Sequence, residues 1–118
     1  LLVEDNEDLL KVMADSLSRE YHIIKATNGK EAIEQLEKTK DIVVVISDVM
    51  MPVMNGIELC HYMKKQDEWL HIPIILLTAK SSESDIIEGY EAGADDYITK
   101  PFQLTLLLVK IKSLRKNK

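Results

Sequence analysis

The hydrophobic and polar positions follow two different periods, and the two alternate along the chain. Short apolar runs are typical of buried strands, whereas apolar residues that recur every three or four positions are typical of helices packed on one face. The runs that we expect to form strands are Leu1–Val3, Tyr21–Ala26, Ile42–Ile46, Pro73–Thr78 and Tyr97–Thr99. The pattern therefore predicts five strands that alternate with five helices.

Asparagine, serine and glycine mark most of the places where the helices are expected to begin. The starts lie near Asn6, at Asn28-Gly29, at Asn55-Gly56, between Ser81 and Ser84, and at Gln103. Strands that alternate with helices are parallel and joined by right-handed crossovers, which gives a sheet covered on both faces. The β-branched run Ile42–Ile46 fits a strand buried on both faces. The predicted fold class is α/β, a doubly wound parallel sheet that binds ligands at the carboxyl ends of its strands.

A chain of 118 residues is long enough for one globular domain and too short for two ordinary ones, so we expect a single domain over residues 1–118. It starts without a methionine and inside an expected strand, which favours a piece of a longer chain. No apolar stretch approaches the roughly 18–20 residues of a membrane span, and no signal peptide is recognisable. Cys60 is the one cysteine, so no internal disulfide can form, and we expect a cytoplasmic protein without membrane insertion.

The formal charge is −5, but its two signs are unevenly distributed. Five of the 15 basic residues follow residue 109, with no acid among them: Lys110, Lys112, Arg115, Lys116 and Lys118. Residues 1–109 therefore carry 10 basic and 20 acidic side chains, and so acidic a body is a poor nucleic-acid binder. We interpret the basic end as cations at the carboxyl end of the last helix, ahead of a linker; a DNA-binding arm is the alternative.

Charged and hydroxyl side chains gather just past the carboxyl ends of the expected strands. They are Glu4 and Asp5 after the first, Asp48 after the third, Thr78 after the fourth and Lys100 after the fifth. If the first and third strands are neighbours, the three carboxylates converge and repel one another unless a cation lies among them. Oxygen ligands without histidine or cysteine favour a hard ion, and Mg²⁺ suits a site that leaves room for water.

Lys100 and Thr78 add a cation and a hydroxyl to this acidic pocket, which is an arrangement suited to a phosphoryl group. A carboxylate can itself attack phosphorus, and Asp48 is the best placed because a long buried strand precedes it and an open turn follows. A structural ion pair of Lys100 with Asp48 or Asp5 is the plainer interpretation, and position alone does not decide between the two. The setting Thr99-Lys100-Pro101-Phe102 favours the phosphoryl site.

Several motifs, in order along the chain, make it similar to the receiver domain of two-component response regulators over nearly its whole length. The motifs are Leu2-Val3-Glu4-Asp5-Asn6, Asp48-Val49-Met50-Met51-Pro52, Asn55-Gly56, Ile74-Ile75-Leu76-Leu77-Thr78-Ala79, Gly89-Tyr90-Glu91-Ala92-Gly93-Ala94-Asp95-Asp96-Tyr97 and Lys100-Pro101-Phe102. The resemblance implies a flavodoxin-like fold, with strand order 2-1-3-4-5 and a helix after each strand. It extends to receivers inside hybrid sensor kinases.

For the site, the resemblance implies that Asp48 accepts a phosphoryl group from a histidine of a partner kinase. It implies that Asp5, Asp48 and the backbone carbonyl of Met50 hold Mg²⁺, with Glu4 acting chiefly through water. In this family, the positions of Met50 and Lys80 tune the lifetime of the phosphoryl group.

The resemblance also implies a switch. Lys100 would pair with the phosphoryl oxygens, and its bond to Pro101 would be cis. Thr78 would turn its hydroxyl toward the phosphoryl group, and Tyr97 would swing inward to fill the space left behind. The phosphoryl group would thereby shift the population between two packings of the fourth helix, fifth strand and fifth helix.

The same resemblance implies a histidine kinase as partner and an attached output domain, for which a DNA-binding domain is one candidate. Leu106 and Val109 lie opposite the buried face of the last helix. Exposed apolar residues are often unremarkable, and the alternative is a homodimer or output surface near the fourth helix. We do not expect an enzyme that acts on other substrates, because such a domain assists only its own phosphorylation and dephosphorylation.

Three other functions stay open. A Mg²⁺-dependent phosphohydrolase with an aspartyl nucleophile usually needs a second acid two residues further on, where this chain has Met50. A flavin-binding module of the same strand order would have a Ser-, Thr- and Gly-rich phosphate loop in place of Glu4-Asp5-Asn6. A docking receiver that is never phosphorylated is disfavoured by the complete set of Glu4, Asp5, Asp48, Thr78 and Lys100.

Overall fold

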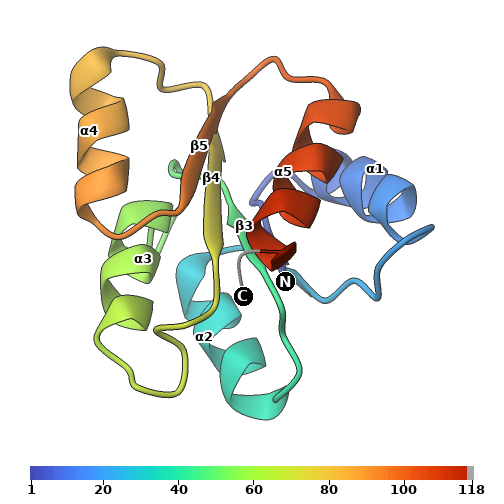
Figure 1. The fold of residues 1–118 in the computed structure, drawn as a ribbon, viewed down its shortest axis with the longest axis horizontal. Coiled ribbons are helices and arrows are strands. Elements are labelled where there is room, and N and C mark those ends of the chain that lie inside the picture. The colour runs from blue at the N-terminus through green and yellow to red at the C-terminus, as the bar shows by residue number, and fades with distance from the viewer. Residues whose placement is uncertain (117–118) are drawn as a thin grey trace.

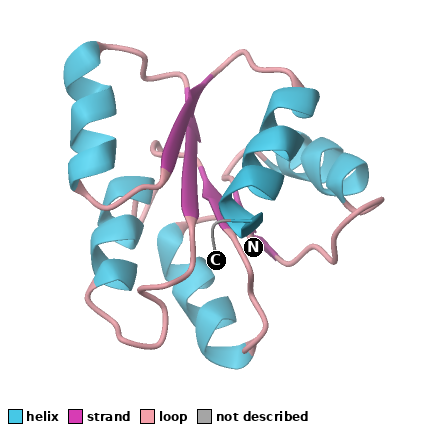
Figure 2. Ribbon diagram, viewed as in Figure 1, coloured by secondary structure: helices cyan, strands magenta, loops and turns pink. Residues whose placement is uncertain are grey.

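The computed structural model describes residues 1–116, which form a five-stranded parallel sheet in the order β2-β1-β3-β4-β5 (Figure 1). The strands are β1 (Leu2–Val3), β2 (Lys25–Ala26), β3 (Val45–Ser47), β4 (Ile74–Thr78) and β5 (Asp96–Thr99). The helices are α1 (Glu7–Leu17), α2 (Gly29–Lys38), α3 (Gly56–Lys64), α4 (Glu83–Glu91) and α5 (Leu104–Lys116). Helices α1 and α5 cover one face of the sheet and α2, α3 and α4 the other (Figure 2), which confirms the predicted doubly wound, flavodoxin-like fold. Within these residues, no helix is long and apolar enough to cross a membrane.

The first four helices begin where the sequence predicted, and side-chain caps explain why. The side chains of Asn6, Asn28, Asn55 and Ser82 each accept a hydrogen bond from the backbone N–H three residues further on, at 2.8–3.1 Å. At Asn55 the cap is reciprocal, because the Glu58 carboxylate accepts from the Asn55 N–H at 3.0 Å. Each cap stabilises its helix by about 1 kcal/mol, so these starts are fixed by local chemistry.

The strand β4 shows how the two faces of the sheet are filled. Ile74 and Leu76 belong to the hydrophobic cluster that includes α2 and α3, whereas Ile75 and Leu77 belong to the cluster that includes α1 and α5. Burial of each such side chain contributes about 1.5–3 kcal/mol. Because both faces are covered, the strand carries no polar alternation, as the sequence pattern predicted.

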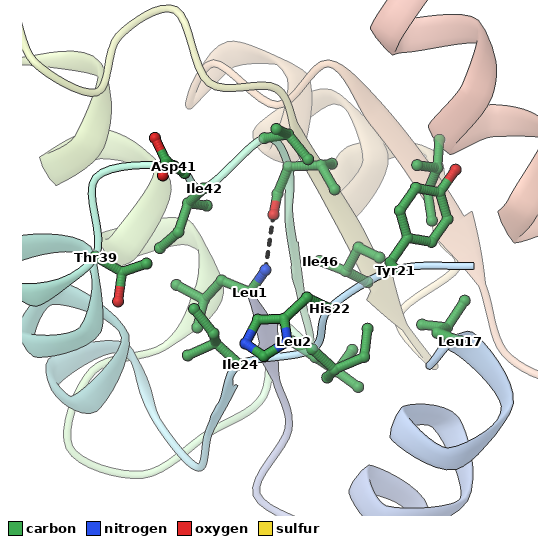
Figure 3. Close-up of a pocket in the computed structure, with 14 residues that line it drawn as sticks. Leu1, Leu2, Leu17, Tyr21, His22, Ile24, Thr39, Asp41, Ile42 and Ile46 are labelled. Atoms are coloured by element: carbon green, nitrogen blue, oxygen red, sulfur yellow. Dashed lines mark hydrogen bonds between the residues drawn. The ribbon is translucent and has the colours of Figure 1, made fainter. Parts of the chain in front are cut away.

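The strands β2 and β3 start later than predicted. We expected Tyr21–Ala26 and Ile42–Ile46, whereas the paired residues are Lys25–Ala26 and Val45–Ser47. The reason is that β1 lies between them and pairs with both only from Leu2 onward. The residues ahead of β2 and β3 have no strand between them and instead line a cavity of about 370 Å³ (Figure 3).

The amino group of Leu1 lies at this cavity. It donates a hydrogen bond to the carbonyl oxygen of Val44 at 2.9 Å, which Figure 3 marks with a dashed line. Burial lowers the pKa of this amino group from 8.0 to about 6, because the charged form loses hydration that one carbonyl does not replace. The nitrogen of Leu1 thus lies among the residues that precede β2 and β3.

The basic carboxyl end contacts the rest of the chain. Lys110 forms an ion pair with Asp96 of β5 at 2.7 Å, and Lys112 forms one with Glu20 in the turn after α1 at 3.1 Å. Arg115 lies 5.8 Å from the ring centroid of Tyr21. These cations therefore have partners within the domain. Lys118, the last of the basic residues in the sequence, lies outside the described residues.

Candidate functional site

Three carboxylates meet at the carboxyl edge of the sheet. Glu4 and Asp5 follow β1, and Asp48 follows the neighbouring strand β3. Each offers an oxygen, and these oxygens all lie within 4.8 Å of one another. Glu4 and Asp48 are buried, at 3% and 8% exposure, whereas Asp5 is exposed at the rim. The central position of β1 thus brings together acids that are more than forty residues apart in sequence.

Lys100, which follows β5, reaches into this cluster. Its ammonium nitrogen lies 2.9 Å from Glu4 Oε1 and 2.9 Å from Asp48 Oδ2. The plainer interpretation of the sequence allowed an ion pair with Asp48 or Asp5; the Asp48 pair is present, but the second partner is Glu4. Asp5 was the wrong choice because it lies at the exposed rim while Glu4 is buried beside Asp48.

Burial sets the protonation of these groups. It raises the pKa of Glu4, and the hydrogen bond from Lys100 offsets this only in part. Burial alone would lower the pKa of Lys100, but its bonds to Asp48 and Glu4 outweigh that effect, so the pKa lies above the usual value. With Lys100 protonated and the three acids ionised, three negative charges face one positive charge. Counted with every carboxylate ionised, the formal charge of the cluster is −2.

Hydrogen bonds shape the loop that carries Asp48. Its Oδ1 atom accepts from the Met50 N–H at 3.1 Å, and the Gly56 N–H donates to the Val49 carbonyl at 2.9 Å. Asn55-Gly56 begins α3, as the sequence predicted, and the residue of this loop with a left-handed backbone is Val53, at φ 69°. Gly56 is needed for another reason, since a Cβ there would collide with the Asp48 carbonyl oxygen.

Thr78 and Tyr97 meet at the backbone of Lys80. The buried Thr78 hydroxyl accepts from the Lys80 N–H at 3.3 Å, and the Tyr97 hydroxyl donates to the Lys80 carbonyl at 2.7 Å. The half-buried Tyr97 ring packs against Gly89 of α4, where a Cβ would lie 2.7 Å from it. The sequence pointed to Lys80 only as a position that tunes the phosphoryl lifetime in the family. The contacts described here are made by its backbone, which every residue type has, so the sequence could not predict them.

Met50, Asp5 and Lys80 line an open cavity of about 370 Å³ beside the acidic cluster. Met50 is 58% exposed, so the backbone of this loop lies near solvent. The Lys100–Pro101 peptide bond is cis, as the resemblance implied. Access from solvent therefore exists on the Asp5 side of the cluster.

The donor set fits Mg²⁺. It consists of carboxylate oxygens only, with a net charge of −2 and one exposed acid that leaves room for water. A divalent ion would balance the negative charge of the carboxylates that Lys100 does not neutralise. The chemistry available is therefore a carboxylate with an ammonium on one side and a place for a hard cation on the other.

The fold and the site together define a class: a doubly wound α/β domain with an acidic cluster and a lysine at the carboxyl edge of its sheet. The family model described as the response regulator receiver domain matches residues 1–112, and the chain belongs to this family. The resemblance inferred from the motifs is confirmed.

Two curated relatives and one solved structure illustrate the similarity. The chain is 40% identical over 118 residues to histidine kinase P4 of Formosa agariphila, covering 100% of this chain and 8% of that protein. It is 39% identical over 115 residues to the alkaline phosphatase synthesis transcriptional regulatory protein PhoP of Bacillus subtilis, covering 97% and 47%. The signal receiver domain of a histidine kinase from Syntrophus aciditrophicus has a TM-score of 0.90 at 37% identity, covering 98% of this chain and 88% of that one. The chain spans less than half the length of these two curated relatives.

Proposed function

We propose that Asp48 takes a phosphoryl group from the phosphohistidine of a partner kinase in a Mg²⁺-dependent reaction. The observation that carries the proposal is the setting of the Asp48 carboxylate. One oxygen accepts from the Lys100 ammonium at 2.9 Å and the other from the Met50 N–H at 3.1 Å, beside the oxygens of Glu4 and Asp5. A carboxylate held between a cation and a potential metal site can attack phosphorus without facing uncompensated charge.

In this proposal Asp5, Asp48 and the backbone carbonyl of Met50 hold the ion, and Glu4 acts chiefly through water. When bound, Mg²⁺ neutralises charge on the transferring oxygens. The raised pKa of Glu4 supports a cation here, because the ionised carboxylate lacks sufficient compensation from Lys100. The exposure of Asp5 leaves one side of the site open to the incoming phosphoryl group.

The transfer itself is a displacement at phosphorus. An Asp48 oxygen forms the new P–O bond while the P–N bond to the imidazole breaks and its electron pair stays on the nitrogen. Lys100 keeps its proton at neutral pH, because its pKa is raised, and so remains a charged donor for the phosphoryl oxygens. The Thr78 hydroxyl donates to another oxygen. The domain acts on no other substrate and assists only its own phosphorylation and dephosphorylation.

The switch in this proposal passes through Lys80. When Thr78 turns toward the phosphoryl group, it gives up the Lys80 N–H, and the bridge between Thr78 and Tyr97 changes. Tyr97 contacts α4 at Gly89, so the change reaches that helix. Pro101, next to Lys100, adjusts with it. The population of two packings of α4, β5 and α5 shifts as a result.

In this proposal the output surface spans α4, β5 and α5, and both of its helices carry exposed apolar residues. Ile87 and Tyr90 on α4, with Leu106 and Val109 on α5, are 46–58% exposed. We propose that this face pairs with a second copy or with an attached output domain, which in one candidate arrangement binds DNA. We place the domain in the cytoplasm, where its buried thiol Cys60 stays reduced.

The phosphoacceptor is tested by incubation with acetyl phosphate and Mg²⁺, followed by intact-mass measurement. We expect the wild type to gain one phosphoryl group and Asp48→Asn to gain none. The matched control is Asp67→Asn at an exposed acid, which should behave as the wild type. A wild type that gains no mass would refute the proposal.

The apolar face is tested by light scattering with beryllofluoride, Mg²⁺ and the wild type, beside the variants Leu106→Lys and Val109→Lys. We expect the loaded wild type to increase in mass, and each lysine to weaken the association because it introduces a charge into an apolar contact. A loaded wild type that stays monomeric would exclude the homodimer and leave the output domain as the occupant of this face.

A further inference from the structure

The first residue of α2 lies against the loop that follows Asp48. The Gly29 N–H donates a hydrogen bond to the Met54 carbonyl at 2.9 Å, and Gly29 is buried. A Cβ at this position would lie 2.6 Å from Met54 Cγ, 2.9 Å from Met54 Cβ and 2.9 Å from the Met54 carbonyl oxygen. Gly29 is not among the residues with a left-handed backbone, so close approach is the reason that glycine fits here.

A different rotamer of Met54 would not make room for a side chain at position 29. Rotation about the Met54 side chain moves Cγ, but Cβ and the carbonyl oxygen belong to the fixed part of the residue. The backbone of either Gly29 or Met54 must therefore shift. A substitution at Gly29 therefore displaces one of these two backbone segments and not merely a flexible side chain.

The amino end of α2 is the more firmly held of the two. The Asn28 side chain accepts from the Glu31 N–H at 2.9 Å, and the Glu31 carboxylate accepts from both the N–H and the hydroxyl of Thr27 at 2.9 and 2.8 Å. Further along the helix, Ala32 and Leu36 are buried in the core. The loop is the part that gives way.

The loop reaches from Asp48 to Asn55 and carries bonds of its own at both ends and in the middle, where the Met54 N–H donates to the Pro52 carbonyl at 2.7 Å. Near the start, the Met50 N–H donates to Asp48 Oδ1, and near the end the Gly56 N–H donates to the Val49 carbonyl. The middle contains the left-handed Val53 and Met54, and the bond from Gly29 ties it to another helix. Only residues 51–53 separate Met54 from Met50, and of these Met51 is buried in the core, so we expect a displacement of Met54 to reach the Met50 peptide through this short stretch of backbone.

We infer that Gly29 is a positioning residue for the metal site. Its lack of a side chain lets α2 hold Met54 in place, and the loop backbone between Met54 and Met50 then places the Met50 carbonyl where it can bind Mg²⁺. The inference rests on the proposed function, in which this carbonyl is a ligand. Gly29 touches neither ion nor phosphoryl group and acts through the loop alone.

The test is the Mg²⁺ dissociation constant of Gly29→Ala, measured by isothermal titration calorimetry. We expect it to rise about tenfold, the lower end of the effect of losing a residue that orients a metal ligand. The phosphorylation rate with acetyl phosphate should fall at limiting Mg²⁺ and recover when the ion is saturating. The control Glu34→Gly lies on the exposed side of α2, lowers helix propensity without contacting Met54, and should leave the dissociation constant unchanged.

A second pair of variants separates the contact from general destabilisation. Met54→Gly removes the Cβ and Cγ atoms that a side chain at position 29 would meet. Gly29→Ala should therefore raise the Mg²⁺ dissociation constant less in the Met54→Gly background than in the wild type. If Gly29→Ala alone does not fold, the double variant is compared with Met54→Gly. Equal effects in both backgrounds, or a dissociation constant that matches the Glu34→Gly control, would overturn the inference. If the wild type binds Mg²⁺ and accepts phosphate in either of these cases, the proposed function stands.

Discussion

The pairing of Lys100 with two buried carboxylates leads to a sharp prediction about stability. Replacing Lys100 with methionine keeps most of the hydrocarbon stem and removes the ammonium that lies 2.9 Å from Glu4 and 2.9 Å from Asp48. The two acids then face each other and Asp5 without a cation. We expect the variant to be less stable than the wild type in Mg²⁺-free buffer.

The magnitude follows from the distances. At 2.9 Å and an effective dielectric constant of about 20, each pair is worth roughly 6 kcal/mol before desolvation. Most of that is offset by the cost of burying the charges, and breaking a buried pair typically costs about 3–5 kcal/mol. Since 21% of the Lys100 side chain is exposed, we expect about 3 kcal/mol. This is a large part of the roughly 5–15 kcal/mol that stabilises a domain.

Magnesium should change this result. The cluster carries −2 in the wild type and −3 in Lys100→Met, so the variant gains more from a bound cation. The assay is urea unfolding of both proteins with and without Mg²⁺. The control is Lys112→Met, which breaks the exposed pair with Glu20 and should cost less than about 0.5 kcal/mol. The reasoning is refuted if Lys100→Met loses no more stability than this control, or if Mg²⁺ stabilises it no more than the wild type.

Three further predictions concern buried titratable groups. The raised pKa of Glu4 means that its ionised form is disfavoured on folding, chiefly by burial, so Glu4→Gln should raise the urea midpoint in Mg²⁺-free buffer at pH 7 while weakening Mg²⁺ binding in calorimetry. The Leu1 amino group has a pKa of about 6 when folded and 8.0 when unfolded, so the unfolded chain binds the proton first. The free energy of unfolding of the 118-residue chain should therefore fall by about 2 kcal/mol from pH 8 to pH 6, a dependence that acetylation of Leu1 removes. Burial raises the pKa of Cys60 to about 11, so iodoacetamide should label it only in urea, and labelling of the native protein seen by mass spectrometry would contradict its burial.

Local chemistry explains which features of the fold were predictable. The side chains of Asn6, Asn28 and Asn55 accept hydrogen bonds from the first turn of the helix that each one caps. The strand Ile74–Thr78 is apolar at almost every position, which by itself indicates that both of its faces are buried. Each signal lies within a few residues of the element that it marks. Alternation of such elements then leaves few ways to connect them, which is why the α/β class followed from the sequence.

Features that depend on a neighbouring strand were predicted less well. The residues of Tyr21–Ile24 are as β-prone as those of a strand, yet they lie outside β2, because β1 pairs only from Leu2 onward and bonds only the Ile24 carbonyl among them. The second partner of Lys100 is Glu4, 96 positions away, and nothing near either residue distinguishes Glu4 from Asp5. Register and burial decide such contacts, and both are properties of the assembled sheet.

The sequence by itself determined the order of strands and helices, the helix starts and the kinds of side chain at the carboxyl edge of the sheet, because each of these is written in residues close together in the chain. Only the tertiary structure decided how these side chains pair, that Lys80 joins Thr78 to Tyr97 through its backbone, and that Gly29 holds the loop after Asp48. Main-chain atoms make these last contacts, and every residue type offers the same main-chain atoms. Their positions therefore follow from packing alone.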